Sequence, residues 1–185
     1  AVHATGLCAV GLDAERVVVR EDGSAAILDP GLGPVWTEAA LETSDDGGPG
    51  RAGLAPELLA DATAVSPAVD LYALGALLFR CMAGVEHAAA GGADEAAARR
   101  PNARRPSASI FLSEVVHDLL DPDAAGRPAS AGELVAILRE RRKSAWWIAR
   151  HPAAAGAAGP DPAPPAAAEA DAATPPEWPE GVSPD

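Results

Sequence analysis

The side chains that could take part in chemistry are few and widely spaced. Cys8 and Cys81 stand far apart and indicate no disulfide framework, and Lys143 is the single lysine. The histidines lack the spacing of zinc ligands. They are His3, His87, His117 and His151.

The stretch 139–150 combines basic side chains with the neighbouring pair Trp146-Trp147. One interpretation is contact with a membrane surface or an acidic partner, with tryptophan at the interface. The other is a last helix of the domain whose tryptophans pack back on the body, and we favour this second interpretation. On this view, residues 144–150 form a basic, tryptophan-containing connector.

Composition excludes some classes of function. The chain has 185 residues and a net charge of −13, with 48% apolar but only 4% aromatic residues. We expect no nucleic-acid binding, because phosphate contacts need clustered Lys and Arg. A signal peptide and a long apolar run are both lacking in this sequence, which favours a cytoplasmic location. The Ala, Gly, Pro and Arg bias suggests a bacterial source.

Composition changes near residue 151. From His151 to Asp185 the sequence is mostly Ala and Pro, with six acidic residues and no Lys or Arg. Such a segment cannot bury enough apolar surface to offset its ordering entropy. We therefore expect residues 151–185 to be a disordered tail.

The remaining residues predict an α-rich α+β domain. Residues 17–19 and 25–28 read as two short strands joined by the turn chemistry of residues 21–24. Ser66-Pro67 opens an apolar helix that runs to Met82 and is closed by Gly84. Further helices are predicted over 112–120 and after Ser130, which with Glu133 fits a capping box. The Gly-rich stretch 31–53 reads as a loop.

Five motifs stand in an order and at a spacing that resemble the protein kinase family, over residues 1–143. The segment from His3 to Val19, H-A-T-G-L-C-A-V-G-L-D-A-E-R-V-V-V, is similar to the catalytic loop H-x-x-G-I-V-H-R-D-L-K-P-E-N-I-L-L. The other four are Asp29-Pro30-Gly31 for D-F-G, Ala55-Pro56-Glu57 for A-P-E, Ser66 to Gly75 for S-P-x-x-D-x-Y-S-x-G, and Gly126-Arg127-Pro128 for the late R-P. Bacterial serine/threonine kinases are the most similar branch, and the chain looks like their C-terminal lobe.

The resemblance also shows what is missing for phosphoryl transfer. The catalytic H-R-D becomes Ala9-Val10-Gly11, so Gly11 occupies the base position and offers no proton acceptor. Arg16 replaces the metal-binding asparagine, and a guanidinium cannot coordinate Mg²⁺. The resemblance leaves Asp29, at the aspartate of D-F-G, as a candidate Mg²⁺ ligand. One carboxylate without its partner makes a poor metal site, so we favour a carboxylate at a strand end or turn. Asp13 stands where serine/threonine kinases carry a lysine. Neither a Gly-rich nucleotide loop nor a lysine-bearing strand precedes His3, so we expect the N-lobe to be absent.

The residues that match the family best are those that support its fold. Glu57 and Arg127 match a buried ion pair that ties the A-P-E segment to the late helices. Asp70 matches the helix residue that hydrogen-bonds the backbone of the catalytic loop. Loss of catalytic groups with retention of these supports is what a fold kept for binding should show.

These observations predict a catalytically inactive, pseudokinase-like module that binds a protein partner or a neighbouring domain, with no cofactor. The alternative is the C-lobe of a longer, divergent serine/threonine kinase that uses another base, binds ATP and Mg²⁺ and phosphorylates proteins. A third is a decayed gene product without a selected activity.

Overall fold

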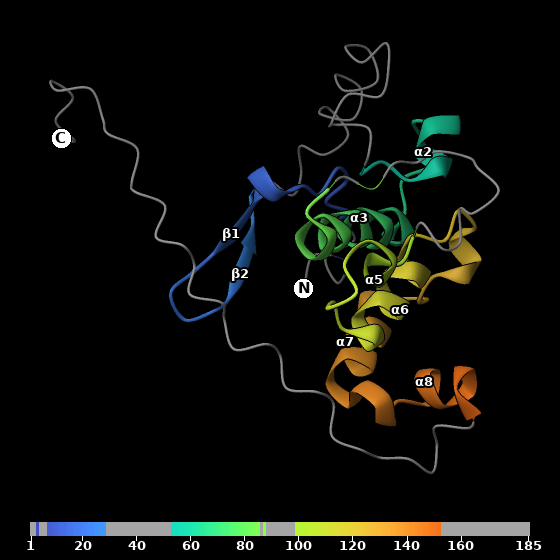
Figure 1. Ribbon diagram of the computed structural model, residues 1–185. Coiled ribbons are helices and arrows are strands. Elements are labelled where there is room, and N and C mark those ends of the chain that lie inside the picture. Colours follow the sequence, from blue (N-terminus) through green and yellow to red (C-terminus); the bar gives the residue numbers. More distant parts are fainter. Residues whose placement is uncertain (1–2, 4–6, 29–52, 86, 88–98, 153–185) are drawn as a thin grey trace, which may run out of the picture.

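The computed structural model describes residues 3, 7–28, 53–85, 87 and 99–152. Within these residues the fold is α-rich with one two-stranded antiparallel sheet (Figure 1), which agrees with the predicted α+β class. Asp29, most of the predicted loop 31–53 and nearly all of the predicted tail lie outside the described residues.

The hairpin forms where the β-branched run predicted it. Strand β1 (Val17–Val19) pairs with β2 (Ala25–Ile27), with Val17 opposite Ile27 and Val19 opposite Ala25. The turn is closed by the Gly23 N–H, which donates to the Arg20 carbonyl at 2.9 Å, and glycine tolerates the φ of 77° found there. The second strand ends at Ile27, one residue before the predicted end, and the 3-10 turn η2 (Ala14–Arg16) leads into β1.

Helix α3 (Pro67–Ala83) is the central element of the body (Figure 1). It begins after Ser66 and ends at Gly84, whose φ of 74° is the left-handed conformation that ends many helices. Its two sides contribute to different apolar clusters. Tyr72 and Phe79 belong to a cluster that also includes Val10, before the hairpin, and α2 (Pro56–Ala60). Leu71 belongs to a second cluster, which it forms with the C-terminal helices. The helix is therefore buried nearly all round, as its sequence predicts.

The remaining helices pack on one side of α3. The predicted helix 112–120 is observed as α6 (Ile110–Leu119), preceded by the short α5 (Pro101–Arg104). After the turn η3 (Ala124–Gly126), α7 (Ala131–Glu140) begins with the predicted cap, in which Ser130 Oγ accepts from the Glu133 N–H at 3.1 Å. The turn η4 (Arg141–Lys143) and α8 (Ala145–Arg150) complete the described chain.

The basic stretch is not one continuous helix. Arg141 has a φ of 55°, which ends α7, and Ser144 starts α8 by accepting the Trp147 N–H on its side chain at 3.2 Å. Trp147 is buried in the C-terminal apolar cluster, and Trp146 packs beside it. Of the two interpretations of this stretch, the structure shows the packing of the tryptophans against the body.

Gly75 sets how closely α3 approaches α6. A Cβ placed at Gly75 would lie 2.7 Å from Leu119 Cβ, and the neighbouring helix cannot yield without moving its backbone. We expect Gly75→Ala to lower the free energy of unfolding by roughly 1–3 kcal/mol, the usual cost of overpacking. Gly132→Ala in α7 is the matched control, because only Ser130 Oγ lies near, at 3.6 Å. Equal urea midpoints for the two variants would contradict this packing.

His87 gives the body a pH dependence. Its ring is buried edge-on against Phe79 and Tyr72, with centroids 5.3 and 6.3 Å apart, and burial, with the charge of Arg99, lowers its pKa from 6.5 to about 4. Between these two values the unfolded chain binds a proton at this ring and the folded chain does not. Stability should therefore fall as the pH drops from 6.5 towards 4. We expect a smaller fall in urea midpoint for His87→Leu, and an unchanged slope would refute the assignment.

Candidate functional site

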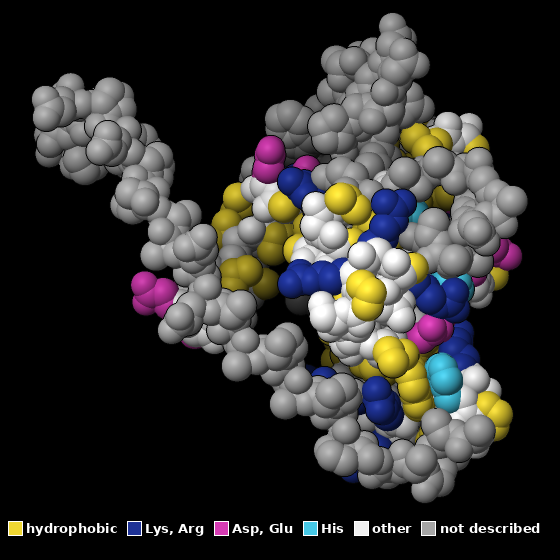
Figure 2. Space-filling model, in the orientation of Figure 1, with side chains coloured by type: hydrophobic (Ala, Val, Ile, Leu, Met, Phe, Trp, Pro, Cys, Tyr) yellow, Lys and Arg dark blue, Asp and Glu magenta, His cyan; other side chains and the backbone are white. Residues whose placement is uncertain are grey.

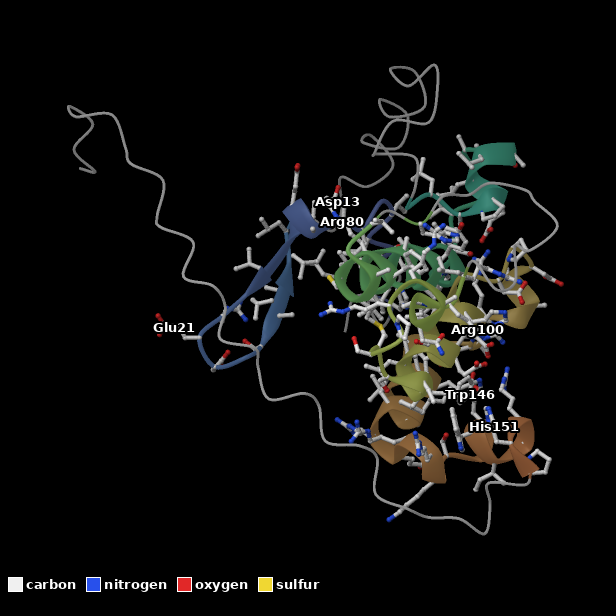
Figure 3. The ribbon with its side chains drawn as sticks, viewed as in Figure 1. Asp13, Glu21, Arg80, Arg100, Trp146 and His151 are labelled. Atoms are coloured by element: carbon white, nitrogen blue, oxygen red, sulfur yellow. The ribbon has the colours of Figure 1, made fainter. Side chains whose placement is uncertain are left out.

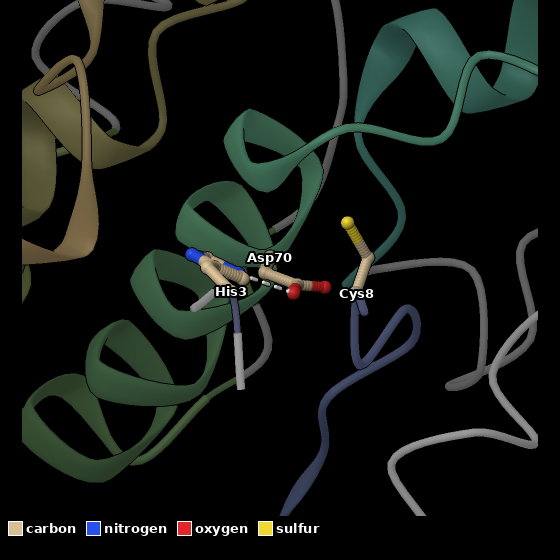
Figure 4. A group of neighbouring side chains, drawn as sticks. All are labelled: His3, Cys8 and Asp70. Carbon is tan, nitrogen blue, oxygen red and sulfur yellow. Dashed lines mark hydrogen bonds and ion pairs between the residues drawn. The ribbon is translucent and has the colours of Figure 1, made fainter. Parts of the chain in front are cut away.

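Asp70 holds the loop Ala9–Gly11 in place. Asp70 lies in the first turn of α3 and is only 7% exposed. Its Oδ2 accepts the Ala9 N–H at 2.8 Å and its Oδ1 accepts the Val10 N–H at 2.7 Å. His3 Nε2 lies 2.7 Å from Oδ2 as well (Figure 4). The carboxylate of Asp70 thus fixes a loop sixty residues away in sequence.

Arg16 holds the same loop from its carbonyl side. Its Nη1 donates to the carbonyls of Val10 at 2.7 Å and Gly11 at 3.0 Å. Val10 is fully buried with a φ of 42°, which a β-branched residue rarely adopts and which costs on the order of 1–3 kcal/mol. A carboxylate on the N–H groups and a guanidinium on the carbonyls together maintain this conformation. The sequence identified Arg16 only as a lost metal ligand and did not predict this contact.

The loop itself offers no group for proton transfer. Val10 is enclosed in the core, and Gly11 has a φ of 68° and no side chain at the position aligned with a catalytic base. Asp13, at the position of the family's lysine, caps η2 through Oδ1, which accepts the N–H groups of Glu15 and Arg16 at 2.9 and 3.0 Å. In the part of the chain that the structure describes, the polar side chains that contact this loop therefore bind its backbone.

We call Asp70 and its contacts with His3, Ala9 and Val10 the clamp. Among the described residues, it forms with Cys8 one group of side chains that could hold a metal ion. One ligand atom each from His3, Cys8 and Asp70 lies within 4.8 Å of the others (Figure 4), which histidine spacing did not predict. Both Asp70 oxygens already accept hydrogen bonds from the loop. Burial, and then the charge of Asp70, raises the pKa of the Cys8 thiol, which disfavours the thiolate form that metals bind. The donor set suits a hydrogen-bonded clamp and not a metal site.

The expected ion pair between Glu57 and Arg127 is present. Arg127 Nη1 and Nη2 contact the two Glu57 carboxylate oxygens at 2.7 and 2.9 Å. The Arg127 side chain is fully buried, whereas that of Glu57 is 25% exposed, so the pair is buried on one side only. Burial alone would raise the pKa of Glu57, but the hydrogen bonds and charge of Arg127 outweigh it and the pKa is lowered.

Arg127 also contacts two further segments, α3 and the turn after α6. It donates to the carbonyls of Ala68 at 2.9 Å and Asp121 at 2.8 Å, and its guanidinium lies 5.0 Å from the centre of the Tyr72 ring. One side chain thus connects α2, the start of α3 and the turn after α6. The two supports that the sequence singled out are polar hubs of the fold.

An apolar hollow lies beside the clamp, between the hairpin, α3 and α7. Its volume is about 190 Å³. It is lined by His3, Ala9, Leu12, Ile27, Asp70, Leu71, Leu74 and Ala131. Nearby, Val18 and Val19 on β1 are 43% and 69% exposed, and hydrophobic side chains cover this part of the surface in Figure 2. No local sequence pattern predicts this hollow, because its walls come from segments far apart in the chain.

The C-terminal helix is anchored to α6 by Asp118. Its Oδ2 accepts Trp146 Nε1 at 2.9 Å and Arg150 Nη2 at 2.5 Å. Trp146 and His151 mark this region in Figure 3, where α8 lies beside α7. Residues 145–150 therefore form a short helix held against α6.

A scan of protein-family models gives no match to this chain, and a search of curated proteins gives no significant match. Among the described helices, none is both long and apolar enough to cross a bilayer.

Proposed function

We propose that the chain is a kinase-like C-terminal lobe without catalytic activity that works as a protein-binding module. The observation that carries the proposal is the contrast within one loop. Asp70 and Arg16 hold the backbone of Ala9–Gly11 in a strained conformation, yet Gly11 provides no base and Arg16 no metal ligand. Maintaining the shape of a catalytic loop without its chemistry is consistent with a fold used for binding.

The hairpin is the surface we assign to the partner. Leu28, Val18 and Val19 are 45%, 43% and 69% exposed, and both strands have an open edge within the described residues. Exposed apolar side chains that gather on a sheet edge are typical of interaction sites. The apolar hollow beneath Ile27 extends this surface towards α3. The partner, or neighbouring domain, should present an apolar segment able to fill the hollow.

Paired surface variants test this function. Val18→Lys with Val19→Lys changes the hairpin, and Val65→Lys with Val85→Lys changes two exposed valines elsewhere, 41% and 45% exposed. Proteins retained by the intact chain in an affinity experiment should be lost with the hairpin variant and kept with the control variant. Equal retention by both variants would contradict the assignment.

A further inference from the structure

The basic residues of this chain are unevenly distributed along the sequence. Of the 14 Lys and Arg, all except Arg51 lie in the described residues. Residues 153–185 contain no Lys or Arg at all. Their acidic residues are Asp161, Glu169, Asp171, Glu177, Glu180 and Asp185. The C-terminal segment therefore differs in charge from the helices that precede it.

The strongest concentration of positive charge is the turn between α7 and α8. We call residues 139–143 the basic turn, because Glu140 is its one acidic residue and the other four are Arg or Lys. Arg139, Arg141 and Lys143 are exposed. Arg139 lies in the last turn of α7, where a cation interacts favourably with the helix dipole.

The basic turn is held in a fixed shape. The Arg141 carbonyl accepts both the Ser144 N–H at 3.1 Å and the Ser144 hydroxyl at 2.7 Å, and Ser144 is buried. The Arg142 guanidinium lies 5.6 Å from the centre of the buried Trp147 ring. The charges are thus presented on a preorganised backbone, which reduces the entropy lost when an anionic group binds.

We propose that the basic turn binds the acidic stretch of the chain's own C-terminal segment, between Asp161 and Glu180. Ten residues lie between Arg150 and Asp161, so the eleven steps from one to the other can span up to about 36–40 Å when extended. Covalent linkage gives such a segment an effective concentration in the millimolar range. The contact needs charge pairing but no folded tail, in keeping with its Ala/Pro composition. This inference does not depend on the proposed function.

The test uses the full chain and its backbone amide NMR spectrum. Raising NaCl from 10 mM to 1 M shortens the Debye length from about 30 Å to about 3 Å. Amides of residues 139–143 and 161–180 should shift together with salt, and Arg139→Glu, Arg141→Glu and Lys143→Glu combined should abolish the change at 161–180. Arg104→Glu with Arg105→Glu, an exposed pair in and after α5, is the matched control and should preserve it.

Two results would overturn the proposal. One is a salt response at 161–180 that is the same in the charge-reversed turn, the control and the unaltered chain. The other is co-sedimentation of the unaltered chain with phosphatidylglycerol vesicles at 10 mM NaCl that the triple variant loses, which would assign the basic turn to an anionic membrane instead. Absence of vesicle binding together with the paired amide shifts would support the intramolecular contact.

Discussion

Replacing Arg127 with alanine should lower the free energy of unfolding by about 3–5 kcal/mol, because it strands a partly buried carboxylate. The guanidinium is fully buried and serves Glu57 and the carbonyls of Ala68 and Asp121, so three contacts are lost at once. Arg104→Ala removes an exposed guanidinium and should change stability by less than about 0.5 kcal/mol. Urea denaturation of the two variants measures the difference.

A double-mutant cycle with Glu57→Ala separates the ion pair from the other contacts of Arg127. The coupling energy should be clearly favourable at pH 7, where the Glu57 carboxylate is charged. Because the pKa of Glu57 is lowered from 4.5 in the folded state, the coupling should shrink as the pH falls below 4.5 and the carboxylate becomes protonated. Equal midpoints for Arg127→Ala and Arg104→Ala would contradict both this network and the alignment that predicted it.

Asp70→Ala should have an effect of similar size. It leaves the buried N–H groups of Ala9 and Val10 without their acceptor, at a cost of about 1–3 kcal/mol each. It also removes one of the two groups that hold the strained Val10. Hydrogen exchange at the Ala9 and Val10 amides should accelerate more than exchange in the centre of α6. Asp70→Asn keeps one acceptor oxygen, so its exchange rates at Ala9 and Val10 should lie between those of the unaltered chain and those of Asp70→Ala.

Asp61→Ala is the control for this experiment. Asp61 is exposed and its carboxylate accepts only from Thr63 among the contacts described, so its removal should leave the loop amides unchanged. Undiminished protection of Ala9 and Val10 in Asp70→Ala would show that the clamp does not maintain the loop.

The sequence predicted those elements whose signals are local. Ser66-Pro67 and Gly84 mark the ends of α3, and Ser130 with Glu133 marks the start of α7, because capping depends on neighbouring residues. The short helices α2 and α5 were missed, although each begins with a proline at its first position. Helices of four or five residues carry no periodicity to detect.

The candidate site was predicted only where the family resemblance supplied long-range pairs. The contacts of Asp70 and of Arg127 with Glu57 join residues about 60 and 70 apart, and no local pattern specifies them. The contact of Arg16 is local but depends on a positive φ at Val10, which a valine does not lead one to expect. The break at Arg141 was missed for the same reason, although Ser144 was an available cap for α8.

The most direct test of the account is phosphate transfer from radiolabelled ATP by the purified chain. On the proposed kinase-like alignment, Gly11 takes the place of the base, and Arg16 is occupied by two loop carbonyls. We therefore predict no incorporation above a heat-denatured control, either into the chain itself or into generic protein substrates. Incorporation clearly above that control, and abolished by Asp29→Ala, would contradict the central claim that this lobe has no catalytic activity.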